Sequence, residues 1–223
     1  MQIAVLLFEG LTALDAIGPY EVLRSVPGWE VKFVADEPGA KRTDSKATAL
    51  VADAGFEDVK DPDAVLVPGG FGTRALLDDE RVLDWVRDVD QRTKWTTSVC
   101  TGSLVLGAAG LLEGKRATSH WLYLEALEEY GCEPTSERVV RDGKIWTAAG
   151  VSSGIDLALA MVAEEAGPEL AQAVQLAIEY DPEPPFDAGS PKKAPKEIVD
   201  VVRQVAAQED PLLATPQDKT AAG

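Results

Sequence analysis

One of the two cysteines, Cys100, stands where an apolar stretch meets a run of small residues. Residues 95–99 predict a buried strand, and Thr101-Gly102-Ser103 allow a sharp turn into a helix at 102–109. In such an elbow the strained turn lifts a reactive side chain off the sheet, and the next backbone N–H faces the substrate. Cys100 is therefore a candidate nucleophile, with a thiol pKa that we expect the helix N-terminus to lower. The same stretch, taken alone, also suits a small buried cysteine at a strand end.

A glycine turn at the end of another apolar run strengthens the case for a site. Residues 65–67 lead into Pro68-Gly69-Gly70-Phe71. Ligands of an open parallel sheet bind beyond the carboxyl ends of its strands, so we expect this turn to lie beside the elbow. The backbone N–H groups of Gly70 and Thr101 would then form an oxyanion hole. A tight turn without function is the alternative for the glycines.

Asp15 is the preferred acid or base beside the cysteine. It follows the first apolar run, at 2–7, and its neighbours Leu14, Ala16 and Ile17 are apolar. A carboxyl in an apolar pocket beside a thiol has a raised pKa and can share a proton with the sulfur. A helix-capping or first-turn role is the alternative for Asp15.

Two other titratable residues are weaker candidates. Glu21 lies three residues before Arg24, a spacing that favours a salt bridge on a helix. His120 is the single histidine, so any cysteine–histidine dyad must use it, although it also suits packing against Trp121. Together with Phe71, His120 and Trp121 are candidates for the lining of an apolar substrate pocket, and core or interface positions are the alternative.

The elements that must position these residues alternate along the chain. Apolar runs at 2–7, 30–35 and 64–67 alternate with amphipathic stretches at 14–24 and 81–90. This alternation is typical of βα units, so we predict an α/β fold with a mostly parallel sheet.

The second half of the chain predicts a hairpin and further helices. Asp142-Gly143 lies between apolar runs at 138–140 and 144–147, which is a strong hairpin signal. We expect helices at 121–130, 153–165, 168–180 and 196–207. Because prolines crowd the segment after Asp181, we divide the chain into a domain at 1–191 and a C-terminal helix with a mobile tail at 192–223.

Composition excludes several classes of function. The 223 residues carry a formal net charge of −17, from 38 acidic and 21 basic residues. Because such a field repels phosphates and anionic lipids, we expect neither nucleic acid nor a membrane as a partner. No stretch is long enough to cross a bilayer, and residues 1–8 lack the basic flank of a secretory signal. Two cysteines make no disulfide framework, which fits a cytoplasmic protein.

Five segments together resemble the ThiJ/PfpI family of the class I glutamine amidotransferase-like superfamily, and most of all its isonitrile hydratase branch. The segments are Leu14-Asp15 with Gly18-Pro19-Tyr20-Glu21-Val22, Pro68-Gly69-Gly70, Cys100-Thr101-Gly102-Ser103, Ala117-Thr118-Ser119-His120-Trp121 and residues 179–186. The similarity covers residues 1–191. It implies a flavodoxin-like three-layer sandwich with a mostly parallel sheet and a cysteine nucleophile elbow.

The resemblance also implies an activity and its residues. Members of this branch hydrate an isonitrile, R–N≡C, to an N-substituted formamide, so the expected protein is a hydro-lyase that needs no metal or organic cofactor. The family's catalytic cysteine, aspartate and hydroxyl residue fall on Cys100, Asp15 and Thr101. A small-molecule substrate is expected. Family dimers are common, so a homodimer is expected too, in which the loop from Phe186 to Pro191 helps to close the site.

Two departures separate the chain from other branches of the superfamily. Protease-like relatives carry histidine directly after the cysteine, where this chain has Thr101, and relatives that act on glyoxals or sense oxidants commonly carry glutamate where it has Asp15. The alternatives to a hydratase are a cysteine-based redox or stress sensor, a glyoxalase-like protein, and a stand-alone sensor domain like those fused to AraC-type regulators. The last would lack the basic recognition helix of a DNA binder.

Overall fold

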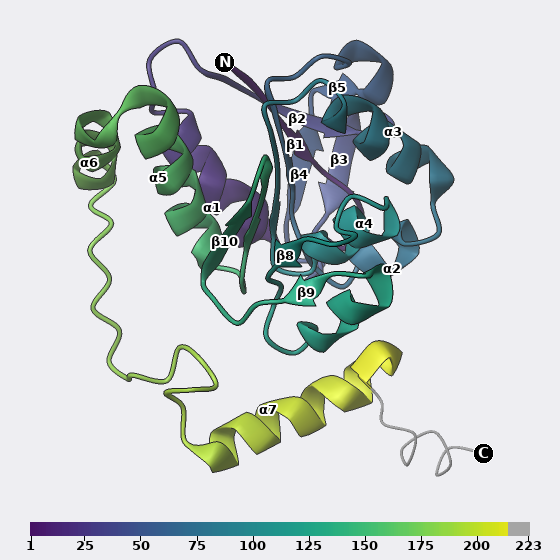
Figure 1. The fold of residues 1–223 in the computed structure, drawn as a ribbon, viewed down its shortest axis with the longest axis vertical. Coiled ribbons are helices and arrows are strands. Elements are labelled where there is room, and N and C mark those ends of the chain that lie inside the picture. Colours follow the sequence, from purple (N-terminus) through teal and green to yellow (C-terminus); the bar gives the residue numbers. More distant parts are fainter. Residues whose placement is uncertain (214–223) are drawn as a thin grey trace.

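One mixed sheet of seven strands divides the molecule into three layers (Figure 1). The computed structural model describes residues 1–213. The strand order is β10-β11-β7-β6-β1-β2-β5, and every neighbouring pair is parallel except β10 with β11. The strands are β1 (Gln2–Leu6), β2 (Glu30–Ala35), β5 (Ala54–Gly55), β6 (Ala64–Val67), β7 (Trp95–Val99), β10 (Val139–Asp142) and β11 (Ile145–Ala148).

Helices cover both faces of this sheet. On one side α1 packs against α5 and α5 against α6, while α2, α3 and α4 lie on the other side (Figure 1). These helices are α1 (Ala13–Leu23), α2 (Thr73–Leu76), α3 (Glu80–Asp90), α4 (Gly102–Ala108), α5 (Ser153–Ala166) and α6 (Pro168–Ala177). The prediction of a three-layer α/β sandwich with a mostly parallel sheet is therefore confirmed.

The central strands form the core because both of their faces are covered. All residues of β6 and β7 are buried, and so are the last four of β1. Strands buried along their whole length, apolar throughout in β6 and with buried hydroxyl residues in β7, are typical of a sheet with helices on both sides. The predicted hairpin is also present, since β10 and β11 are antiparallel and Gly143 in their turn has a φ of 60°.

Several short elements differ from the sequence-based expectation. Two small two-stranded sheets were not predicted, and the expected helix at 121–130 is only a 3₁₀ helix, η2 (Glu125–Tyr130). Its backbone bonds span three residues, as from Leu127 N–H to the Leu124 carbonyl, and Gly131 ends it in the left-handed conformation. The other short elements are β3 (Gly39–Arg42), β4 (Ala49–Ala52), η1 (Phe56–Asp58), β8 (Arg116–Ala117) and β9 (Glu133–Pro134).

The C-terminal part stands beside the body. Residues after α6 run mostly exposed to α7 (Lys196–Glu209), as predicted, and α7 buries none of its residues (Figure 1). A last turn, η3 (Pro211–Leu213), follows. The domain boundary at residue 191 stays a prediction. The tail expected to be mobile begins after residue 207; its residues 208–213 end α7 and form η3, with Asp210 buried, and residues 214–223 lie outside the described residues. Within residues 1–213, no helix has the length and apolar character needed to cross a bilayer.

The start of α4 approaches the carboxyl end of β6 closely enough to exclude any side chain between them. A Cβ on Gly102, at the start of α4, would lie 2.0 Å from the Val67 carbonyl oxygen at the end of β6. Only glycine therefore allows the helix to begin at this distance from the neighbouring strand.

Gly102→Ala is expected to lower the free energy of unfolding by about 2 kcal/mol or more, because the backbone of β6 cannot move away from the new methyl group without disturbing the sheet. Urea unfolding followed by circular dichroism measures the effect. Gly189→Ala is the matched control, since a Cβ there meets nothing within 4 Å. Equal stability of the two variants would show that the close approach carries no energetic weight.

Candidate active site

Cys100 occupies a strained turn between β7 and α4. Its φ is 58°, in the left-handed region that non-glycine residues rarely adopt. Hydrogen bonds on both sides hold this conformation: the Cys100 N–H donates to the carbonyls of Ala148 and Ala149 at 3.0 and 2.9 Å, and its own carbonyl accepts from the hydroxyls of Ser103 and Ser119, each at 3.1 Å. A strained residue persists only where its surroundings fix it in this way. The geometry is that of the predicted elbow.

Asp15 lies wholly buried in the first turn of α1, at the carboxyl end of β1. Its Oδ2 accepts a hydrogen bond of 2.9 Å from the Gly69 N–H. Within residues 1–213, no hydrogen bond reaches Oδ1, which leaves this oxygen available to carry a proton. Asp15 lies in the first helical turn, as the alternative had it, but it does not cap the helix, because Thr12 holds the N-cap position and the Asp15 carboxyl points to another loop.

Asp15 and Cys100 influence each other's titration. Burial raises the pKa of Asp15 to about 7, although the Gly69 hydrogen bond and the Cys100 thiol favour the charged form. Burial and then the charge of Asp15 raise the pKa of Cys100, against the backbone N–H groups of Thr101 and Val151. The raised pKa of Asp15 was predicted, but the lowered thiol pKa was wrong, because the start of α4 does not offset burial. The pair therefore retains a proton at neutral pH.

Gly70 and Thr101 lie together, as the sheet topology predicts. The Gly70 N–H donates to Thr101 Oγ1 at 3.0 Å, while the Thr101 N–H acts on the Cys100 sulfur. Gly70 has a φ of 128°, and a Cβ on it would lie 2.4 Å from the Thr12 nitrogen, so no other residue fits. The two predicted oxyanion donors thus share one small region, and their role in catalysis stays a prediction.

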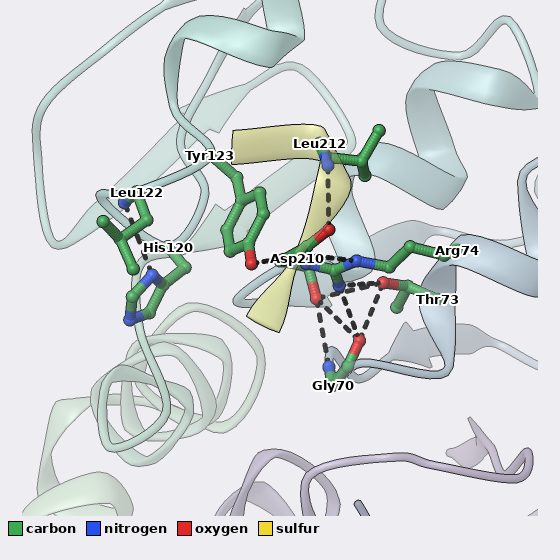
Figure 2. Close-up of polar contacts among 9 residues, drawn as sticks. Gly70, Thr73, Arg74, His120, Leu122, Tyr123, Asp210 and Leu212 are labelled. Atoms are coloured by element: carbon green, nitrogen blue, oxygen red, sulfur yellow. Dashed lines mark hydrogen bonds and ion pairs between the residues drawn. The ribbon is translucent and has the colours of Figure 1, made fainter. Parts of the chain in front are cut away.

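His120 does not form a dyad with the cysteine in the part of the chain that the structure describes. Its Nδ1 accepts a hydrogen bond of 3.4 Å from the Leu122 N–H (Figure 2), and its ring centre lies 6.0 Å from those of Trp121 and Tyr123. Burial and then the charge of Arg74 lower the pKa of His120, which keeps the imidazole neutral at pH 7. These contacts favour the packing interpretation.

The surface cleft at Phe71 does not include the other two predicted pocket residues. Phe71 is 51% exposed and lines a surface cleft of about 520 Å³ together with Gly10, Arg42 and Lys46, among others. Neither His120 nor Trp121 lines this cleft. Glu21 forms the surface ion pair with Arg24 that its spacing indicated, at 2.6 Å.

Several residues at the site carried no signal in the sequence. The Val151 N–H acts on the Cys100 sulfur through its backbone, which residue type does not reveal. Arg74, Tyr123 and Asp210 form a buried polar cluster beside Gly70 (Figure 2), yet 136 residues separate Arg74 from Asp210. No cluster of three His, Cys, Asp or Glu side chains that could hold a metal ion occurs within residues 1–213.

A cysteine on a strained elbow, with a buried aspartate from the first βα unit beside it, defines a class of α/β sandwich proteins. The chain belongs to the DJ-1/PfpI family, which its residues 1–164 match. This membership confirms the resemblance found in the sequence.

Two relatives show which kinds of protein in this family the chain is similar to. An isonitrile hydratase from Pseudomonas putida is 47% identical over 207 residues, which cover 93% of this chain and 90% of that protein. The HTH-type transcriptional regulator CdhR from Pseudomonas aeruginosa is 31% identical over 76% of this chain, which spans only 52% of the regulator. The first likeness supports the expected kind of enzyme.

Solved structures agree with this placement. The crystal structure of a ThiJ/PfpI family protein from Pseudomonas syringae has a TM-score of 0.90 and 41% identity, covering 96% of this chain and 90% of that one. DJ-1beta from Drosophila melanogaster has a TM-score of 0.72 at 24% identity, covering 80% of this chain and 97% of that one, and shares the fold.

Asp15→Asn is expected to remove a pH dependence of stability. Because folding raises the pKa of Asp15 from 3.8 to about 7, its contribution to stability is complete below pH 3.8 and is lost as the pH rises through 7. The free energy of unfolding of the variant should therefore rise relative to that of the wild type as the pH increases from about 4 to about 8. The total change in this difference should be on the order of 2–4 kcal/mol.

Urea unfolding at a series of pH values measures this difference. Glu21→Gln, which removes a half-exposed carboxyl from the same helix, reports the effect of lost charge alone. A difference between Asp15→Asn and wild type that stays constant with pH would contradict the raised pKa.

Proposed function

We propose that the chain is an isonitrile hydratase that adds water to R–N≡C to give the formamide R–NH–CHO, with Cys100 as nucleophile and Asp15 as acid and base. The observation that carries this proposal is the buried pair of Cys100 and Asp15, which sets a thiol on a strained turn beside a carboxyl whose pKa burial raises to about 7. The 47% identity to an isonitrile hydratase over 93% of the chain supports it.

The first half of the reaction forms a covalent adduct. The Cys100 sulfur attacks the terminal carbon of the isonitrile, and the proton that the pair shares passes through Asp15 to that same carbon. The product is a thioimidate, R–N=CH–S–Cys100. Burial of the pair is compatible with this step. The substrate is neutral and the proton comes from the pair itself, so no new net charge has to be stabilised by water.

The second half releases the formamide. Asp15, now ionised, accepts a proton from water as the hydroxide adds to the thioimidate carbon, and it passes that proton to the nitrogen, which leaves Asp15 ionised again. When the carbon–sulfur bond breaks, the thiolate leaves, the formamide forms, and the proton of the added hydroxyl returns to the pair. Gly70 and Thr101 would stabilise the charge that develops, through the Thr101 hydroxyl and backbone N–H groups.

The other candidate functions have less support. A peroxide sensor requires a reactive thiolate, whereas Cys100 is only 6% exposed and burial raises its pKa. The net charge of −17 does not suit a DNA-binding role of its own. A glyoxalase-like activity remains an outcome that substrate screening would reveal, and the cytoplasmic location stays a prediction.

Formamide formation from cyclohexyl isocyanide tests the proposal. Cys100→Ala and Asp15→Asn are each expected to lower kcat/KM by about 10³-fold or more, and Thr101→Val by about 10²-fold. Cys132→Ala, at the other buried cysteine, is the matched control and should retain activity. Circular dichroism verifies folding. Turnover that survives in Cys100→Ala would refute the mechanism, and its absence from the wild type would refute the function.

We also propose that the chain forms a homodimer. The support is a continuous exposed apolar face on α7 that residues 1–213 leave uncovered; it consists of Ile198, Val201, Val202 and Val205. Burial of such a face against a second copy removes it from water.

Light scattering should therefore give twice the 23.8 kDa mass of one chain. Val201→Asp is expected to shift the mass toward that of a monomer, because a charge in the apolar face opposes its burial. Gln204→Asp adds the same charge at an exposed position outside the face and should not. A wild type that stays monomeric at high concentration would overturn the proposal.

A further inference from the structure

A carboxylate from the C-terminal end of the described chain is buried in the body of the protein. Asp210 follows α7 and is 2% exposed, although α7 itself buries nothing. Its Oδ2 pairs with the Arg74 guanidinium and accepts a hydrogen bond of 2.6 Å from the Tyr123 hydroxyl, and its Oδ1 accepts one of 3.0 Å from the Leu212 N–H (Figure 2). Asp210 is thus held as an ionised, fully bonded group.

The same guanidinium continues from Asp210 to the glycine turn after β6. While Arg74 Nε donates to Asp210 at 2.9 Å, Nη1 donates to the Gly70 carbonyl at 2.9 Å and to Thr73 Oγ1 at 2.8 Å (Figure 2). A planar guanidinium with one edge fixed by a carboxylate has little freedom left for its other donors. Asp210 therefore determines where Arg74 holds Gly70.

Gly70 in turn holds the residue that follows the nucleophile. Its N–H donates to Thr101 Oγ1 at 3.0 Å, and the Thr101 hydroxyl donates back to the Gly70 carbonyl at 3.3 Å. That carbonyl is the acceptor that Arg74 also uses. Because glycine offers little resistance to rotation of its peptide planes, these hydrogen bonds set its orientation.

We propose that Asp210 is a positioning residue for the reaction at Cys100. By fixing Arg74 it orients the backbone of Gly70, and through Gly70 it orients the Thr101 hydroxyl beside the sulfur. This inference rests on the proposed hydratase function. It assigns to the segment after α7 a part in the geometry of a site that is built otherwise from residues before 152.

Steady-state kinetics of full-length Asp210→Asn with cyclohexyl isocyanide test the proposal. Asparagine keeps the shape of the side chain but removes the charge that fixes Arg74, so kcat should fall by about tenfold or more while KM changes little. Asp210→Glu, which keeps the charge, should retain more of kcat than Asp210→Asn. Arg74→Lys, which cannot bridge Asp210 and Gly70 with a planar fork, should resemble Asp210→Asn.

Hydrogen–deuterium exchange gives a readout that needs no substrate. Backbone amides in residues 69–74 should exchange faster in Asp210→Asn than in the wild type, because the hydrogen bonds around Gly70 lose their anchor. Asp90→Asn is the matched control, because it removes the carboxylate of another partly buried ion pair, the one with Lys144. This pair lies at the amino ends of the strands, where Asp90 also accepts a hydrogen bond from Thr96, and the glycine turn lies at their carboxyl ends. Asp90→Asn should alter neither kcat nor exchange at residues 69–74.

The outcomes separate the two proposals. If the wild type turns over isonitrile and Asp210→Asn matches it in kcat and in exchange, the positioning role is refuted and the hydratase function stands. An equal loss of kcat in Asp90→Asn would also refute it, because the effect would then be general destabilisation. If the wild type shows no turnover, the function fails, and the exchange of residues 69–74 alone decides whether Asp210 holds the Gly70 turn.

Discussion

The site depends on the burial of one carboxyl and one thiol together at the carboxyl edge of a parallel sheet. Water would stabilise both charged forms, so its exclusion raises both pKa values and leaves a proton to be shared. The rest of the structure makes that burial possible. Apolar central strands bring the loops after β1, β6 and β7 together, and glycines at positions 69, 70 and 102 allow those loops to approach within backbone contact.

The proposed mechanism uses Cys100 as a protonated thiol and not as a preformed thiolate. A helix N-terminus or a neighbouring cation favours the thiolate, but at Cys100 burial and the charge of Asp15 outweigh the backbone N–H groups of Thr101, at the start of α4, and of Val151. Such a thiol is a poor target for solvent-borne reagents and needs a substrate that can accept a proton as the sulfur attacks. The chemistry of an isonitrile carbon, which accepts both a nucleophile and a proton, matches this requirement.

Much of the fold and part of the site could be predicted from the sequence. Alternation of apolar and amphipathic runs gives the sheet and its helices, because burial of both faces leaves a continuous apolar pattern. The small residues after Cys100 and the glycines after β6 indicate the elbow, because they mark where backbone must turn or touch backbone. The burial and the raised pKa of Asp15 could be predicted because its neighbours in the sequence are apolar.

What escaped prediction depends on contacts between distant residues or on the backbone alone. The sign of the Cys100 pKa shift depends on how deeply α4 and its neighbours bury the sulfur, which no local pattern gives. The Val151 N–H acts without regard to its side chain. Asp210 sits among charged and polar residues near the C-terminus, so only the folded chain shows that it meets Arg74 in the interior.

The two edges of the sheet carry one more consequence. At one edge β5 has only two residues, and at the other β10 is a four-residue strand that presents Arg141 and Asp142. Short or charged edges offer no template on which a further strand can add. The edges of the folded sheet therefore oppose edge-to-edge aggregation, although a central strand such as β6 is apolar throughout.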